Sequence, residues 1–126
     1  MKFRAWDGQE MFKVTMLYLT KKGLKIGGGG YLQIELKDIK LMQFTGFKDI
    51  NQAEVYAGDI VTDSRPDEAR YWPVVWEYGC FTIDGSPIWD HAKWITRGRN
   101  KVPAPTYNLE ELEVVGNIYQ NKDLLQ

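Results

Sequence analysis

The strictest pattern in this sequence is the alternation of apolar and polar side chains over residues 31–36. On an extended backbone, Leu32, Ile34 and Leu36 share one face and the polar residues between them share the other, as a half-buried strand requires. Elsewhere the apolar residues form short runs rich in β-branched and aromatic types, and no long stripe has the 3.6-residue period of an amphipathic helix. We therefore predict an all-β fold.

Turn-forming residues divide the rest of the chain into short segments with strand composition. The tract Gly27–Gly30 is predicted to be a flexible loop that interrupts regular structure, and no Lys-Ser or Lys-Thr pair follows it as in a phosphate-binding loop. Near the end of the sequence, Asn121 is predicted to cap a short helical turn through Leu124 and Leu125. Strands are predicted over residues 2–5, 12–20, 24–26, 39–45, 74–77, 79–83 and 112–115.

The segment Val55–Val61 combines a tight turn with the start of a strand. Gly58 and Asp59 are turn-forming residues, and the β-branched Ile60 and Val61 favour the strand that follows. We expect the Asp59 carboxylate to accept hydrogen bonds from the backbone of this turn, which is a structural role and not a catalytic one.

The size of the chain, 126 residues with 44% hydrophobic content, suits one domain or two small subdomains packed closely together. With a formal net charge of −1 and an isoelectric point of about 5.8, the chain has no overall positive charge that would attract nucleic acid or an acidic membrane. The single cysteine, Cys80, excludes an intramolecular disulfide and a cysteine-rich zinc site. No stretch approaches the roughly 20 apolar residues of a membrane span, and residues 1–6 lack the apolar run of a signal peptide. We expect a soluble, intracellular protein.

Five fragments of the sequence form a specific pattern through their order and spacing, although each is weak alone. They are residues 2–7 (KFRAWD), 41–49 (LMQFTGFKD), 55–61 (VYAGDIV), 114–121 (VVGNIYQN) and 124–125 (LL). With these fragments the chain resembles the YopX family of small bacteriophage and prophage proteins, nearly from end to end.

The resemblance implies a mostly-β protein of a phage or prophage, whose later part is similar to an SH3-like barrel. We therefore predict an N-terminal β segment, residues 1–53, packed on an SH3-like barrel, residues 54–126, in one compact unit in the cytoplasm of the host bacterium. The family has no established activity, so the resemblance implies no catalytic residue. Family members usually turn through an asparagine-glycine pair after Asp49, whereas this chain has Asn51 and Gln52, which makes a two-residue type I′ turn less favoured.

The sequence offers few residues for catalysis, so we expect a protein that is not an enzyme and holds no cofactor or metal. His91 follows Asp90, but adjacent residues of a strand point to opposite faces, so the pair does not make an oriented general base. Cys80 lies in a predicted strand and has no basic neighbour in the sequence. We therefore expect it to be a buried apolar residue. Four further carboxylates do not follow the ligand spacing of a calcium-binding loop, and we expect them to be solvated. They are Asp59, Asp63, Asp67 and Glu68.

Residues 71–94 hold more aromatic side chains than one small barrel core accommodates. Some must therefore lie on the surface, where aromatic groups are typical of interfaces, whereas Trp76 is expected to pack in the core from its apolar strand. We predict a protein-interaction surface, used for homo-oligomerisation or for binding a host or phage protein, that is made by Trp72, Trp89 and Trp94.

A second candidate surface is the loop 93–101, which interleaves cations with an aromatic ring. Cations for phosphate contacts and a ring for base stacking are the elements of nucleic-acid binding. The acidic isoelectric point and the glutamates at positions 110, 111 and 113 weigh against this function, so a nucleic-acid-associated phage factor is the alternative to the protein-interaction module. The residues concerned are Lys93, Trp94, Arg97, Arg99 and Lys101.

Overall fold

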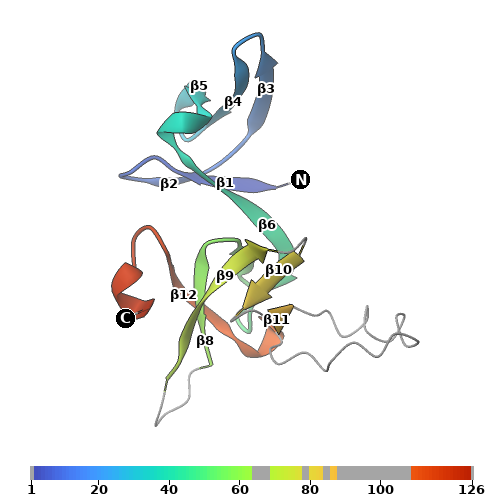
Figure 1. Cartoon of the computed structure of the whole chain (residues 1–126), viewed down its shortest axis with the longest axis vertical. Helices are drawn as coiled ribbons and strands as arrows, with labels where there is room; N and C mark the ends of the chain where they lie inside the picture. The colour runs from blue at the N-terminus through green and yellow to red at the C-terminus, as the bar shows by residue number, and fades with distance from the viewer. Residues whose placement is uncertain (1, 64–68, 78–79, 84–85, 88–108, 126) are drawn as a thin grey trace, which may run out of the picture. The chain divides into compact units, whose positions relative to one another are not determined.

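The computed structural model of the chain describes residues 2–63, 69–77, 80–83, 86–87 and 109–125. In these ranges the chain forms strands joined by turns and three short 3-10 turns, which confirms the all-β prediction (Figure 1). None of the helical segments in the described ranges has the length and apolar content needed to cross a membrane. The chain divides into two compact units, Met1–Phe44 and Thr45–Gln126, so the first unit ends before the predicted boundary at residue 53.

The first unit is built from hairpins. Strand β4 pairs with β3 on one side and with β5 on the other, both antiparallel, and β1 pairs antiparallel with β2 and with the beginning of β6. Its elements are β1 (Phe3–Trp6), β2 (Met11–Lys13), β3 (Met16–Thr20), β4 (Gly23–Gly28), β5 (Tyr31–Glu35), the 3-10 turn η1 (Leu36–Asp38) and the first part of β6 (Lys40–Lys48).

The strand predicted over residues 12–20 is two strands, because the chain changes partners at its middle. The backbone N–H of Val14 donates to the carbonyl oxygen of Phe3 at 3.0 Å, whereas that of Thr15 donates to the carbonyl oxygen of Gly27 at 2.9 Å. Residues before this point therefore pair with β1, and residues after it pair with β4. The hydrophobic core of this unit consists of Ala5, Phe12, Ile26 and Ile39, with Val14, Ile34 and Leu41 packed against it.

The prediction that the glycine tract interrupts all regular structure is wrong for its first half. Gly27 and Gly28 are buried and end strand β4. Gly28 has a φ of +150°, and a Cβ atom there would overlap the carbonyl oxygen of Lys13. At Gly29, with a φ of +56°, a Cβ atom would lie 2.5 Å from Cγ of Phe12. Glycine is needed here because the backbone lies directly against the residues of β2.

The second unit contains a five-stranded sheet in the order β11-β10-β9-β8-β12, which curls into a barrel-like shape, and a pairing of β6 with β7 (Figure 1). The register of β12 on β8 shifts between Val114 and Gly116, where the strand is bulged. The elements are β7 (Glu54–Tyr56), β8 (Asp59–Thr62), β9 (Tyr71–Glu77), β10 (Cys80–Ile83), β11 (Ser86–Pro87), the 3-10 turn η2 (Leu109–Glu111), β12 (Glu113–Asn117) and the 3-10 turn η3 (Lys122–Leu125).

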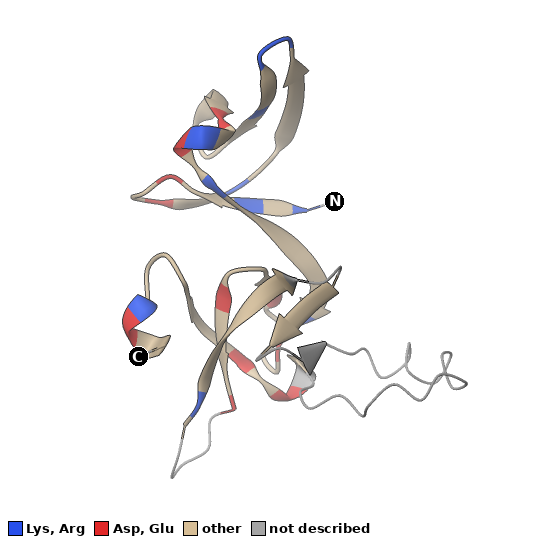
Figure 2. Cartoon of the chain, viewed as in Figure 1, with Lys and Arg blue, Asp and Glu red and all other residues tan. Residues whose placement is uncertain are grey.

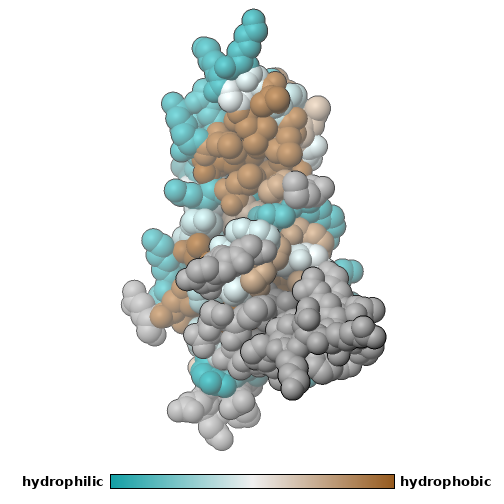
Figure 3. All heavy atoms as spheres, turned by 45° about the vertical axis from the view of Figure 1, so that its right-hand side comes forward, coloured by the Kyte–Doolittle hydropathy of each residue, from teal (hydrophilic) through white to brown (hydrophobic). Residues whose placement is uncertain are grey.

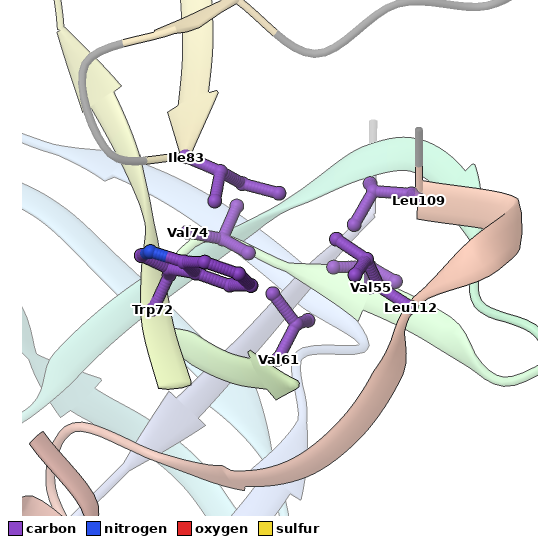
Figure 4. Close-up of a cluster of buried hydrophobic side chains, with 7 residues drawn as sticks. All are labelled: Val55, Val61, Trp72, Val74, Ile83, Leu109 and Leu112. Carbon is purple, nitrogen blue, oxygen red and sulfur yellow. The ribbon is translucent and has the colours of Figure 1, made fainter. Parts of the chain in front are cut away.

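The core of the second unit gathers side chains from β7, β8, β9, β10, η2 and the residue between η2 and β12 (Figure 4). Trp72 is part of it, with 8% of its surface exposed. Trp76, which we expected in the core, is 54% exposed, and its ring packs edge-on against Phe81 at 4.6 Å between centroids. The buried cluster consists of Val55, Val61, Trp72, Val74, Ile83, Leu109 and Leu112.

Candidate binding surface

The aspartate of the segment Val55–Val61 has the structural role that the sequence predicts. Asp59 is 1% exposed, so the expectation that it is solvated is wrong, and its Oδ2 accepts a hydrogen bond of 2.8 Å from the backbone N–H of Tyr56. Within the same turn, the N–H of Gly58 donates to the carbonyl oxygen of Val74 at 2.7 Å and ties the turn to β9. The carboxylate thus fixes the turn from which β8 starts.

Asp49 organises a second connection in the same unit. Its carboxylate is 1% exposed; Oδ1 accepts from the backbone N–H groups of Asn51 and Ala53 at 2.8 and 2.9 Å, and Oδ2 accepts from that of Val114 at 2.9 Å. The loop between β6 and β7 is therefore linked to β12. These backbone donors provide hydrogen bonds to a buried carboxylate that would otherwise lack partners.

Asn117 plays a similar part after β12. It is 7% exposed, and its Oδ1 accepts from the backbone N–H groups of Tyr119 and Gln120, both at 3.0 Å. The short terminal turn predicted through Leu124 and Leu125 is present as η3, but Asn121 does not cap it with its side chain. The Oδ1 of Asn121 accepts from the N–H of Asn117 at 3.1 Å instead.

The residues singled out as partner-binding fall mostly outside the part of the chain that the structure describes. Trp72 is the exception, and its position in the core weighs against direct contact with a partner, so its interface role stays a prediction. Cys80 is half-buried in β10. Asp63 pairs with Arg70 at 3.4 Å between Oδ2 and Nε. Outside the described residues lie Asp67, Glu68, Asp90, His91, Trp89, Lys93, Trp94, Arg97, Arg99 and Lys101.

An exposed apolar face that the sequence did not indicate lies on the sheet β3-β4-β5. In the register of this sheet Leu17 stands opposite Ile26 and Leu19 stands opposite Leu24, and paired residues of an antiparallel ladder share a face. Ile26 is fully buried in the core of the first unit, yet the exposed fractions of Leu17, Leu19 and Leu24 are 48%, 89% and 37%. The same face of the sheet thus passes from core to surface toward the β3–β4 turn.

The alternating segment 31–36 forms strand β5 as predicted, but its apolar face is only partly covered. Ile34 stands opposite Ile26 and packs against the core, whereas Leu32 is 89% exposed and Leu36, at the start of η1, is 37% exposed. Leu32 and Leu36, expected on the buried face of a half-buried strand, therefore add to the apolar surface. We call Leu17, Leu19, Leu24 and Leu36 the leucine face; hydrophobic side chains gather on the surface of this unit in Figure 3.

A shallow depression of about 310 Å³ lies at the end of the leucine face, beside the first residues of β4. Leu24 and Leu36 provide its apolar part. The turn leading into β4 is held by the Thr20 hydroxyl, which donates to the carbonyl oxygen of Gly23 at 2.7 Å and accepts from the N–H of Lys22 at 3.2 Å. The lining residues are Lys22, Leu24, Lys25, Glu35, Leu36 and Lys37.

The opposite end of β5 is tied to the turn between β1 and β2 by an ionisable pair. The Tyr31 hydroxyl donates to Oδ2 of Asp7 at 2.9 Å. The backbone N–H groups of Glu10 and Gln9 donate to Oδ1 of Asp7 and, together with Tyr31, hold the pKa of its carboxyl below the usual value. Asp7 in turn raises the pKa of Tyr31. Among the residues that the structure describes, no three His, Cys, Asp or Glu side chains are grouped so that they could hold a metal ion.

Comparison with known proteins identifies the family and the fold. The family model described as YopX protein matches residues 2–126. The crystal structure of protein EF1440 from Enterococcus faecalis is similar, with a TM-score of 0.63 and 22% identity over 99% of this chain and 97% of that one. The crystal structure of protein yopX from Bacillus subtilis is similar at a TM-score of 0.55 and 19% identity, over 99% of this chain and 98% of that one. No curated protein matches the chain.

Proposed function

This chain belongs to the YopX family, and from that premise we propose that it is a non-enzymatic phage or prophage accessory protein that binds another protein through its leucine face. The observation that carries the proposal is the exposure of leucines in register on one sheet face that is continuous with a buried core. The partner is a second copy of the chain or a protein of the phage or host.

Exposed leucines are informative here because they are neighbours. Single apolar residues on a surface are ordinary, whereas a contiguous patch marks an interaction site. Leu17 and Leu19 lie on one strand and Leu24 lies opposite Leu19 on the next, so a partner would remove all three from water together. At about 25 cal/mol for each Å² of apolar surface buried, such a patch supplies favourable free energy of association.

Removal of the leucine face tests the proposal. The variant Leu17→Ser/Leu19→Ser removes two exposed apolar side chains from the leucine face. The matched control, Val115→Ser/Leu125→Ser, removes two aliphatic side chains of the second unit that are each 38% exposed. Sedimentation at increasing concentration measures self-association, and capture from a bacterial host lysate with mass spectrometry measures other partners. We expect the first variant, but not the control, to lose association or capture.

Two results would contradict the proposal. One is a wild-type protein that stays monomeric at high concentration and captures nothing above background. The other is an unchanged set of partners in the Leu17→Ser/Leu19→Ser variant when its amide spectrum shows that it is folded. A third variant, Trp89→Ala/Trp94→Ala, tests the aromatic surface inferred from the sequence, since capture that depends on these residues alone would move the interface there.

The alternative function, nucleic-acid binding through loop 93–101, is supported by the interleaved cations and Trp94 in the sequence. A titration of labelled single- and double-stranded DNA at low and high salt decides it. Binding that weakens steeply with salt and is lost in Arg97→Ala/Arg99→Ala would favour this function over the protein-interaction module.

A further inference from the structure

We propose that the partner segment recognised by this protein is acidic and aliphatic, and that it docks in the depression beside the start of β4. This inference rests on the proposed function and names the chemistry of the partner. It is argued from the charge around the depression and from the apolar side chains in it.

The charge of the chain is divided unevenly between its two units. The first unit carries eight Lys and Arg against four Asp and Glu, a formal charge of +4, and the second carries eight against thirteen, a formal charge of −5. The near-neutral total of −1 therefore conceals a basic unit. Figure 2 shows basic residues at the turn between β3 and β4, and Lys22 of this turn lines the depression.

The positive charge is concentrated at the depression itself. Three of the lining residues are lysines, and one is a glutamate. Within the described ranges, the side chains of Lys22 and Lys25 form no ion pair, while Lys37 lies 3.3 Å from Glu35 with both side chains largely exposed to water. An exposed ion pair contributes little, so Lys37 remains open to exchange for a carboxylate of a ligand.

The side chains decide between classes of anionic ligand. Single-stranded nucleic acids use aromatic rings for base stacking, and the lining contains leucines and no aromatic residue. Leu24 and Leu36, each 37% exposed, suit an aliphatic side chain, and the lysines around them suit carboxylates on either side of it. A volume of about 310 Å³ is near the lower end of the range for ligand pockets, which fits one or two side chains of a peptide.

Fluorescence anisotropy with defined peptides tests this inference on the full-length protein. The probe is a labelled ten-residue peptide with two leucines flanked by four glutamates in a Gly-Ser background. One control peptide replaces the leucines by serine, and another replaces the glutamates by lysine. Protein variants are Lys22→Gln/Lys25→Gln and the control Lys48→Gln/Lys122→Gln, which makes the same change of net charge in the second unit.

We expect the acidic leucine peptide to bind at least tenfold more tightly than either control peptide. Binding should weaken at least fivefold in Lys22→Gln/Lys25→Gln, change less than twofold in Lys48→Gln/Lys122→Gln, and weaken with salt. An equal loss of peptide affinity in the two variants would show that binding depends only on the net charge of the protein, and it would overturn the inference. Binding of the lysine peptide, of anionic phospholipid vesicles or of single-stranded DNA in place of the acidic peptide would overturn it as well.

The two proposals fail in different ways. If Leu17→Ser/Leu19→Ser loses its partner while Lys22→Gln/Lys25→Gln keeps it, the leucine face is an interface and the acidic character of the partner is wrong. If neither variant changes association or capture, the proposed function itself is wrong. Amide spectra of each variant establish that it is folded.

Discussion

Gln52 holds a backbone conformation that favours glycine. Its φ is +65°, and it is the only residue other than glycine with a positive φ in the described ranges. The turn around it is closed by hydrogen bonds to Asp49, whose carbonyl oxygen accepts from the N–H of Gln52 at 3.0 Å. The left-handed conformation costs an L-residue about 1–2 kcal/mol, which the hydrogen bonds of the turn offset.

We predict that Gln52→Gly raises the free energy of unfolding by about 0.5–1 kcal/mol, because relief of the strain exceeds the additional entropy that glycine loses on folding. Urea denaturation monitored by tryptophan fluorescence measures the change. The control Gln52→Ala removes the side chain and keeps the strain, so it should not stabilise the protein. A gain of equal size in Gln52→Ala would show that the side chain, and not the backbone, is responsible.

Asp7 provides a prediction about pH. Backbone N–H groups of Glu10 and Gln9 and the Tyr31 hydroxyl all stabilise its ionised form, so its pKa in the folded protein lies below the ordinary value of 3.8. A lowered carboxyl pKa contributes stability that is present above the ordinary value and is lost as the pH falls through the lowered one. In an NMR titration of the carboxyl carbon, Tyr31→Phe should raise this pKa toward the ordinary value, but only in part, since the backbone donors remain. If the pKa of Asp7 is unchanged in Tyr31→Phe, the hydroxyl is not a cause of the lowered pKa.

At the scale of single elements, the glycine tract shows why a loop predicted from composition can be partly wrong, since Gly27 and Gly28 end strand β4. Four consecutive glycines predict freedom, yet Gly28 and Gly29 are required by the close approach of the backbone to Lys13 and Phe12. That approach involves residues fifteen or more positions away, so no local pattern contains it.

Substitutions in the tract separate conformational strain from steric collision. Gly29→Ala and Gly30→Ala both place a side chain at a positive φ, +56° and +92°, but only at Gly29 would the new Cβ meet the ring of Phe12. We expect Gly30→Ala to lower the free energy of unfolding by about 1 kcal/mol and Gly29→Ala to lower it by about 1–3 kcal/mol more. Thermal unfolding compares the two variants. Equal effects would mean that the tract has room for a side chain and that Phe12 does not restrict it.

Strand β5 shows what a period of two can and cannot predict. Alternation identified the strand, because the period follows from the backbone alone. It did not identify which apolar residues are buried, since burial depends on what covers the face: Ile34 lies against the core and Leu32 lies beyond it. For the same reason the expectation that Trp76 packs in the core was wrong: Trp72 and Trp76 occupy one strand, and only Trp72 is covered by neighbouring elements.

The candidate site was missed for a related reason. Leu17, Leu19 and Leu24 lie in two segments predicted as strands, and the register that places them together on an uncovered face appears only in the folded hairpin. In contrast, the role of Asp59 was predictable, because an aspartate next to a glycine before β-branched residues acts within its own turn. A hydrogen bond within one turn could be predicted from the sequence, whereas the burial of a sheet face by distant elements could not.

At the scale of the whole molecule, the described residues form two hydrophobic core clusters, one in each unit. Ile26 is fully buried in the first core, and Ile83 is fully buried in the second. The first unit has only about 44 residues, a size at which a hydrophobic core supplies little net stability. Strand β6 runs from one unit into the other, which gives the two a continuous element.

Matched Ile26→Val and Ile83→Val variants test whether the units open separately. Each removes one buried methylene group, which costs about 0.5–1.5 kcal/mol. If the units open independently, Ile26→Val should speed the exchange of slowly exchanging amides in β1–β5 and leave those of β8, β9 and β12 unchanged, and Ile83→Val should have the reverse effect. Native-state hydrogen exchange at low denaturant measures both sets of amides. An equal increase in exchange rate throughout the chain in either variant would show instead that β6 couples the two cores into one cooperative unit. In that case, binding at the leucine face would also stabilise the second unit by mass action.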